Sequence, residues 1–485
     1  MTSSRSAPRS TSPSRSRTAR RSPAPPTATV PNRSTSASAE GHGGPVDEHP
    51  TRATIERLAR RARRVVAEAD ADTRRLAAAH LADTVGCAIA GSDHPTLERL
   101  LRATAATSGH AGHHPLAATE VDTDLPTAVA IDAVAAHVDE HDAVHPGSGT
   151  VPVGIAAPAA IAVGRHVRAS GRQVLEALVA GVEVMVEAGR HVGGSSLYRR
   201  GWWPSLVVGP LGAAATVAHL LDLDVDRTAQ ALALATTGAG GLLTSDVFAD
   251  GHYWSFGEAA ARGVRAAVAA QHGLTASAGL LDGPTSVAFG PAADPTPDDG
   301  PPHLLGCVAK ASPSSMPFQP VAQALRELRD QRGADTIHEV RVTIPAALLP
   351  FVSAETEVAG PPEAAASLAY VVAASLGPPG DDLDVFRRHD PAETRGRRVV
   401  LRGSELALGP PGSLAAHLEV VGHDGASEPV EATFVPPSAA DPAKYTRNVA
   451  RVGRAHPRFE DLLELDHVDD VTEVLATDRL RGGER

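Results

Sequence analysis

The chain has 485 residues, with 45 Lys and Arg against 57 Asp and Glu and a formal net charge of −12. This length suits several domains, and two cysteines, Cys87 and Cys307, exclude both a disulfide framework and a cysteine zinc cluster. The acidic charge has the wrong sign for a phosphate backbone, so we expect no nucleic-acid partner. No apolar run reaches the ~20 residues of a membrane-spanning helix, and no export signal is evident, so we expect a cytoplasmic protein without a membrane partner.

The N-terminal segment differs from the rest in composition. Residues 1–45 are rich in Ser, Arg, Pro and Thr and hold almost no large apolar side chains. Such a segment cannot offset the entropy lost on ordering, so residues 1–45 are predicted to be a disordered tail. The tail carries seven arginines within residues 1–39 and no acidic residue there, which leaves 38 basic against 57 acidic residues for the remainder.

Alanine-rich segments with Ile, Leu and Val every three or four residues follow, which is the spacing of amphipathic helices. Several are apolar around their whole circumference and should be central. Residues 46–302 are therefore predicted to form an all-helical domain. The expected helices are Ile55–Ala69, Asp72–Ala90, Thr96–Ala106, Pro126–His137, Val153–Val163, Gly171–Val192, Pro210–Leu221, Arg227–Gly238 and Ser255–Gly273.

A Pro-, Asp- and Gly-rich stretch at 290–302 is typical of a linker, and extended β-type runs follow it. Helices interleaved with strands indicate a smaller α+β domain at 303–439, while 440–485 reads as helical again and is predicted to complete the first domain. The expected strands are Glu339–Ile344, Arg397–Arg402, Ala416–Val421 and Glu431–Phe434, and the expected helices are Gln319–Asp330 and Glu363–Leu376. The fold class is thus mainly α.

Two residue types are rare enough to be informative. Only two of the basic residues are lysines, Lys310 and Lys444. A lysine retained in an arginine-rich chain points to a position that needs a compact ammonium. The tryptophans fall at 202–203 and at 254, where they either pack in the core or line one aromatic pocket.

The segment 136–150 concentrates groups that could carry chemistry. If the helix continues, its histidines at i, i+4 and i+8 share one face and could bind a metal, although Pro146 disfavours a helical conformation at the residue before it. The alternatives are a solvated helix end, or metal-free acid/base chemistry between neighbouring carboxylates and imidazoles. The groups concerned are His137, Asp139, Glu140, His141, Asp142 and His145.

A series of motifs, collinear from about Ile55 to Val452, resembles the MmgE/PrpD family, which contains 2-methylcitrate dehydratase, cis-aconitate decarboxylase and iminodisuccinate epimerase. Each motif is weak alone, but their shared order makes chance similarity improbable. The motifs are 81–86, 137–152, 200–205 followed by 209–214, 257–263, 310–315 and 365–376.

The resemblance implies a large helical domain built from both chain ends, a smaller α+β lid, a homodimer, and a cleft without metal or organic cofactor. It also implies a reaction: a proton moves at a carbon beside a carboxylate, and water, carbon dioxide or nothing else departs. We therefore expect a cofactor-independent lyase or isomerase acting on a small carboxylic acid.

Carried over by position, the resemblance makes His145 the acid/base histidine and Lys310 the carboxylate-binding lysine. Glu140 or Asp139 would correspond to the first site aspartate of the family and Asp142 to the second. The expected substrate-binding residues are Arg200, Trp202, Trp203 and Ser314.

This sequence departs from the family at three positions. Trp203 stands where the family has a histidine, His252 where it has a second lysine, and Phe318 in the region of another histidine. A site that has lost a fixed positive charge should take a smaller or less acidic substrate than a tricarboxylate.

Two other functions remain open. One is a metal-dependent hydrolase or lyase that uses His137, His141 and His145. The other is a catalytically inactive family member that acts as a binding protein.

Overall fold

The structure is a computed structural model, and it describes residues 54–107, 109, 111–242, 249–282, 300–380, 382–406, 408, 413–453 and 455–475. The predicted tail, residues 1–45, lies outside the described residues. Residues 52–485 form one compact unit. The unit is mainly helical with a small sheet, which confirms the predicted fold class.

The helical part follows the predicted periodicity closely. Its helix α7 begins at Pro204 and keeps Pro210 in its interior, so it starts one and a half turns earlier than expected. The helices are α1 (Thr54–Glu68), α2 (Ala71–Gly91), α3 (Pro95–Thr107), α4 (Leu125–His137), α5 (Pro152–Val167), α6 (Gly171–His191), α7 (Pro204–Leu220), α8 (Val225–Thr236) and α9 (Asp250–Gln271).

Helix α4 is bounded by clear local signals. The Asp124 carboxylate accepts a hydrogen bond from the backbone N–H of Thr127, and Pro126 occupies the first turn, where its missing N–H costs nothing. The helix ends at His137, and Glu140 then adopts a left-handed φ of 53°, which turns the chain away from the helix axis. His137 is therefore held at a rigid helix end.

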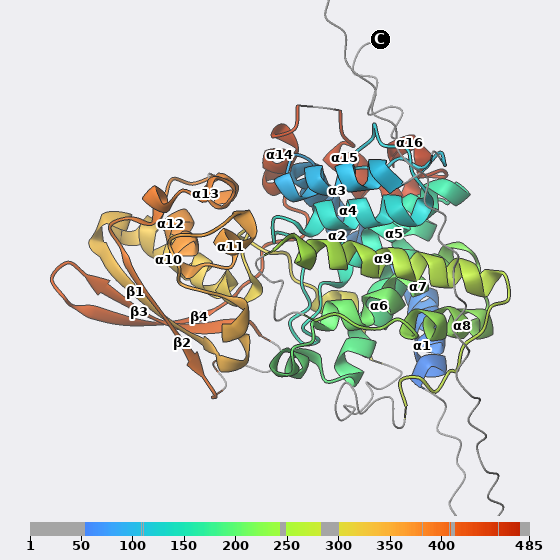
Figure 1. Ribbon diagram of the computed structural model, residues 1–485, viewed down its shortest axis with the longest axis horizontal. Helices are drawn as coiled ribbons and strands as arrows, with labels where there is room; N and C mark the ends of the chain where they lie inside the picture. The colour runs from blue at the N-terminus through green and yellow to red at the C-terminus, as the bar shows by residue number, and fades with distance from the viewer. Residues whose placement is uncertain are drawn as a thin grey trace, which may run out of the picture. The chain divides into compact units, whose positions relative to one another are not determined.

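Glycines let the central helices touch backbone to backbone. A Cβ atom on Gly257 of α9 would lie 2.6 Å from the Ala130 carbonyl oxygen of α4, and one on Gly263 would lie 2.5 Å from the Pro210 carbonyl oxygen of α7. Figure 1 shows α9 running beside α4 and α7. This close packing fixes the N-terminal half of α9 against the end of α4.

The β part is a four-stranded sheet of order β2-β1-β3-β4, in which β1 and β2 are parallel and the other neighbours antiparallel. Helices α10 and α12 pack against the sheet (Figure 1), and their apolar side chains form a hydrophobic core separate from that of the helical part. The bounds are β1 (Ile337–Pro345), β2 (Arg398–Ser404), β3 (Ala415–Gly422), β4 (Ser427–Thr433), α10 (Gln319–Arg332), α11 (Pro361–Ala365), α12 (Leu368–Leu376) and α13 (Asp382–Arg388).

The C-terminal stretch returns to the helical part. Helices α14 (Pro442–Ala450) and α15 (Phe459–Leu463) pack on α2, and α16 (Thr472–Leu475) packs on α5. The separate cores and this return support the predicted division at residues 303 and 439, which stays a prediction. No helix among the described residues is both long and apolar enough to cross a membrane.

A buried ion pair attaches α14 to α2. The Lys444 ammonium lies 2.7 Å from Oδ1 of Asp83, and both side chains are at most 5% exposed. Burial raises the pKa of Asp83, while Lys444 lowers it. Removing the lysine alone would therefore leave a buried carboxylate without its cation.

We predict that Lys444→Met lowers the free energy of unfolding by about 3–5 kcal/mol, because it strands the Asp83 carboxylate. Chemical denaturation followed by circular dichroism measures the loss. The double variant with Asp83→Asn should recover part of it, and a double variant no more stable than Lys444→Met would contradict this explanation.

Candidate active site

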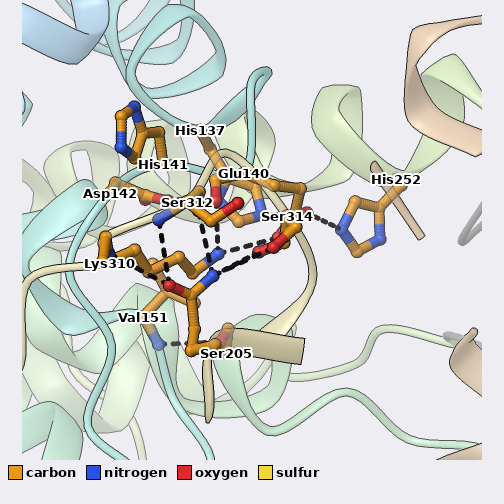
Figure 2. Close-up of polar contacts among 12 residues, drawn as sticks. His137, Glu140, His141, Asp142, Val151, Ser205, His252, Lys310, Ser312 and Ser314 are labelled. Carbon is orange, nitrogen blue, oxygen red and sulfur yellow. Dashed lines mark hydrogen bonds and ion pairs between the residues drawn. The ribbon is translucent and has the colours of Figure 1, made fainter. Parts of the chain in front are cut away.

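Two buried lysines and one partly buried arginine converge on the short segment that follows α4. The Lys310 ammonium donates hydrogen bonds to the Glu140 carbonyl oxygen at 2.8 Å and to Glu140 Oε2 at 2.9 Å (Figure 2). The Lys444 ammonium donates to the His141 carbonyl oxygen at 2.8 Å. Both lysines of the chain are thus buried against two consecutive residues of one segment.

The third cation comes from α13. The Arg387 guanidinium donates to both carboxylate oxygens of Asp139, at 2.9 and 2.6 Å. Such a two-bonded guanidinium–carboxylate pair fixes orientation as well as distance. The Asp139 carboxylate therefore links the helical part to the β part through Arg387. Asp139 is not among the residues that line the cavity described below.

His137 and Asp142 form a buried histidine–carboxylate pair. Nδ1 of His137 lies 3.0 and 3.1 Å from the two Asp142 carboxylate oxygens, and the ring stacks on Phe256 of α9. Gly154 of α5 makes room for the carboxylate, since a Cβ atom there would lie 2.4 Å from Asp142 Oδ2. Because Nδ1 is held by the Asp142 carboxylate, Nε2 of His137 is the nitrogen left for chemistry, and it lies 3.4 Å from Glu140 Oε1 without a hydrogen bond.

The surrounding charges give His137 and Glu140 different proton affinities. Burial alone would lower the pKa of His137, but the carboxylates of Asp142 and Glu140 outweigh it and raise that pKa above 6.5. Burial would raise the pKa of Glu140, but Lys310 and His137 hold it well below its usual range. Glu140 is thus an ionised carboxylate with little affinity for a proton, whereas His137 binds a proton more tightly than an ordinary imidazole does.

His252 completes the polar wall. Its Nε2 lies 3.4 Å from Glu140 Oε1, and its ring stacks on Trp203 with centroids 4.1 Å apart. Burial lowers the pKa of His252, although Glu140 acts in the opposite direction. The imidazole is therefore predominantly neutral at pH 7.

A cavity of about 80 Å³ opens in front of these groups. Its charged and imidazole groups come from residues 137–140, from His252 and from Lys310, while residues 315–362 contribute a mostly apolar side. A cavity of this size holds a small molecule rather than a single ordered water. Its lining is His137, Glu140, Val144, Gly149, Thr150, Val151, Tyr198, Trp203, His252, Tyr253, Lys310, Ser315, Met316, Pro317, Leu348, Phe351 and Pro362.

The structure brings some of the predicted site residues together. Glu140, His252, Lys310 and Trp203 line the cavity, and Asp142 lies directly behind His137. Trp203 and Tyr253 both line the cavity, so the two tryptophan segments do contribute to one aromatic pocket, although Trp254 itself is 54% exposed.

Other predicted substrate-binding residues lie outside that lining. Arg200 is exposed, and Trp202 is partly buried against the helical core. Ser314 is fully buried and accepts hydrogen bonds from the Gln319 side-chain amide, while its neighbour Ser315 takes the place at the cavity.

His145 lies away from the cavity. Its backbone pairs with Thr150, its Nδ1 lies 3.0 Å from the Ser148 hydroxyl, and its ring packs against Gly306 and His303. Burial lowers the pKa of His145 to about 4. The cavity is therefore lined by His137 and not by His145.

The three histidines proposed as metal ligands do not meet. Helix α4 ends at His137, and the left-handed Glu140 turns the chain, so His141 and His145 leave the helical face. Within the described residues, the ligand atoms that lie within 4.8 Å of one another belong to His137, Glu140 and His252. Two imidazoles and a carboxylate suit a zinc-type ion, but Lys310 already binds Glu140.

His137 was expected only as one of several groups in the segment 136–150, and Tyr198 and Tyr253 were not expected in the site. A signal for His137 was available, because it opens the motif that resembles His-x-x-Asp-aromatic-Asp and precedes the two acids by three and five residues. The tyrosines had no comparable signal. They reach the cavity through helix packing alone.

Fold and site together define a mainly helical protein with a smaller α+β part and a buried acid/base cavity. Residues 56–294 match the MmgE/PrpD N-terminal domain. A cis-aconitate decarboxylase-like protein of Aspergillus oryzae is 30% identical over 215 residues, which are 42% of this chain and 41% of that protein. The chain thus spans about two fifths of the length of this curated relative. Residues 56–294 are thus similar to the MmgE/PrpD family, in agreement with the collinear motifs.

We predict that Asp142→Asn lowers the pKa of His137, because it removes the nearest carboxylate that raises it. A histidine ¹⁵N or ¹H NMR titration measures the shift, and the exposed His467 provides an internal reference. An unchanged or higher His137 pKa would show that Asp142 does not control its protonation.

Proposed function

We propose that the protein is a lyase or isomerase that moves a proton at the carbon beside the carboxylate of a small organic acid. The carrying observation is the His137 imidazole, which lines the cavity together with Lys310 and is oriented by Asp142 through Nδ1, while its Nε2 lies 3.4 Å from Glu140 Oε1. Similarity to a family with lyase-type relatives supports the same class of reaction.

His137 would act as the general base. Its Nε2 accepts the proton from the carbon, and the Asp142 carboxylate stabilises the imidazolium that forms. In an elimination the imidazolium passes this proton to the leaving hydroxyl, which departs as water. In a decarboxylation no carbon proton is removed: carbon dioxide leaves, the electrons of the broken bond stay on the carbon, and protonated His137 donates a proton there. In an epimerisation water donates a proton to the opposite face, and His137 releases its own proton to water.

Lys310 would stabilise the charge that develops on the substrate carboxylate. An ammonium has three N–H donors, and two of those on Lys310 are engaged by Glu140. The third remains for a substrate oxygen. Because this donor belongs to a buried and fixed cation, it needs little reorganisation when charge appears on the substrate.

The balance of charge in the cavity favours a small substrate with few carboxylates. Lys310 is the cation of permanent charge in the lining, and Glu140 already neutralises it. Trp203, Tyr253 and Phe351 offer apolar surface instead. A mono- or dicarboxylate with an apolar group fits this lining better than a tricarboxylate does. The expected homodimer and the expected independence of cofactors remain predictions.

We expect His137→Gln to lower kcat/KM at least ~10²-fold, because it removes the base. His145→Gln is the matched control and should retain activity within a few-fold, since this ring lies outside the cavity. In the wild type, kcat/KM should rise with pH through an apparent pKa above 6.5 as His137 loses its proton. Proton exchange at the α-carbon in deuterated buffer provides the assay. The reverse ranking of the two variants would restore His145 as the acid/base group.

Specificity gives an independent test. We expect slow turnover of 2-methylcitrate and cis-aconitate by the wild type, and improved KM for these tricarboxylates in the double variant Trp203→His with His252→Lys, which adds positive charge to the cavity. Steady-state kinetics on both substrates measure the change. Efficient turnover of either tricarboxylate by the wild type would refute the proposal that Trp203 and His252 make the site unsuited to them.

A further inference from the structure

A second cavity, of about 440 Å³, lies next to the same segment as the first but is lined by a different residue of it. Glu140 lines the first cavity, and His141 lines the second. Figure 2 shows the His141 ring pointing away from Glu140. The second cavity is bounded by residues of α10, of the segment 379–383 and of α14.

Arginine dominates the lining of this second cavity. Four arginines line it, two from α10 and two from the C-terminal stretch, against a single carboxylate, Asp382. The concentration is not a consequence of composition, since the whole chain carries a formal charge of −12. The arginines are Arg326, Arg329, Arg447 and Arg451.

Three of these arginines have partners that hold them in place. Arg326 binds Asp382 and the Ala311 carbonyl oxygen. Arg329 donates to the Ser375 and Gly377 carbonyl oxygens, and it pairs with the mostly exposed Asp330. Arg451 pairs with Asp384. These contacts fix the guanidinium groups, and fixed donors bind a ligand with less loss of entropy.

Positive charge at the cavity is left unbalanced. Among the residues that the structure describes, Arg447 has no ion-pair partner. Nδ1 of the buried His141 and Nε of Arg451 have no hydrogen-bond partner either. Burial, and then the charges of Lys444, Lys310, Arg326 and Arg447, hold the pKa of His141 well below its usual range.

We propose that this cavity is a binding site for a small, multiply charged oxyanion, either a phosphate or a polycarboxylate, held by Arg326, Arg447 and the unpartnered nitrogens of His141 and Arg451. Guanidinium groups bind the oxygens of both anions through paired N–H donors. The volume exceeds that of one phosphate ion, so a phosphate ester or a compact polycarboxylate also fits. This site is separate from the proposed reaction site and does not depend on the proposed function.

Isothermal titration calorimetry on the full chain tests the proposal, with sodium phosphate and sodium citrate titrated separately at ionic strength held constant with sodium chloride. We expect saturable binding of one or both anions at one site per chain. Binding of phosphate alone or of citrate alone supports the site and identifies the kind of anion. The absence of saturable binding of both would overturn it.

Two variants and two controls locate the site. Arg447→Gln should weaken binding at least tenfold, and because Arg447 is exposed and unpaired, its loss does not threaten folding. Arg326→Gln should also weaken binding. Arg458→Gln and Arg168→Gln, at arginines 71% and 75% exposed and outside the cavity, should leave the affinity unchanged. Wild-type affinity in Arg447→Gln, or loss of binding in either control, would overturn the assignment.

Discussion

The site depends on one constraint: a turn rich in buried charge after α4 is held by cations that come from far along the chain. Lys310, Arg387 and Lys444 bind Glu140, Asp139 and the His141 carbonyl oxygen. Burying charges is costly unless each is paired and hydrogen-bonded. The turn can therefore exist only when the helical part, the β part and the C-terminal helices have all assembled around it, so correct folding and formation of the site are the same event.

This arrangement also separates the roles of neighbouring ionisable groups. Glu140 lies against Lys310 and stays ionised, while His137 lies between two carboxylates and gains proton affinity. The two groups are three residues apart, but their partners drive their pKa values in opposite directions. Pairs of this kind are how an active site maintains a fixed charge and an exchangeable proton at one pH.

Helices, strands and the importance of Lys310 could be predicted from the sequence because each rests on local pattern or composition. The periodicity of apolar residues gave α1 to α9 within a few residues at most ends. The direction in which a side chain points could not be predicted in this way. His145 and His137 occur in the same segment, and only the packing of His145 against Gly306 and His303, distant in sequence, turns its ring away from the cavity. The possibility that His137, His141 and His145 share one helix face was wrong for a related reason, because the left-handed Glu140 ends the helical periodicity.

The scarcity of lysine has a practical consequence. Lys310 and Lys444 are 1% and 4% exposed, and the chain has no others. An amine-directed reagent therefore meets no side-chain amine on the folded surface. Acylation of either lysine would report that the contacts around the turn after α4 had opened. The rate of acylation would therefore measure how often this part of the folded protein opens locally.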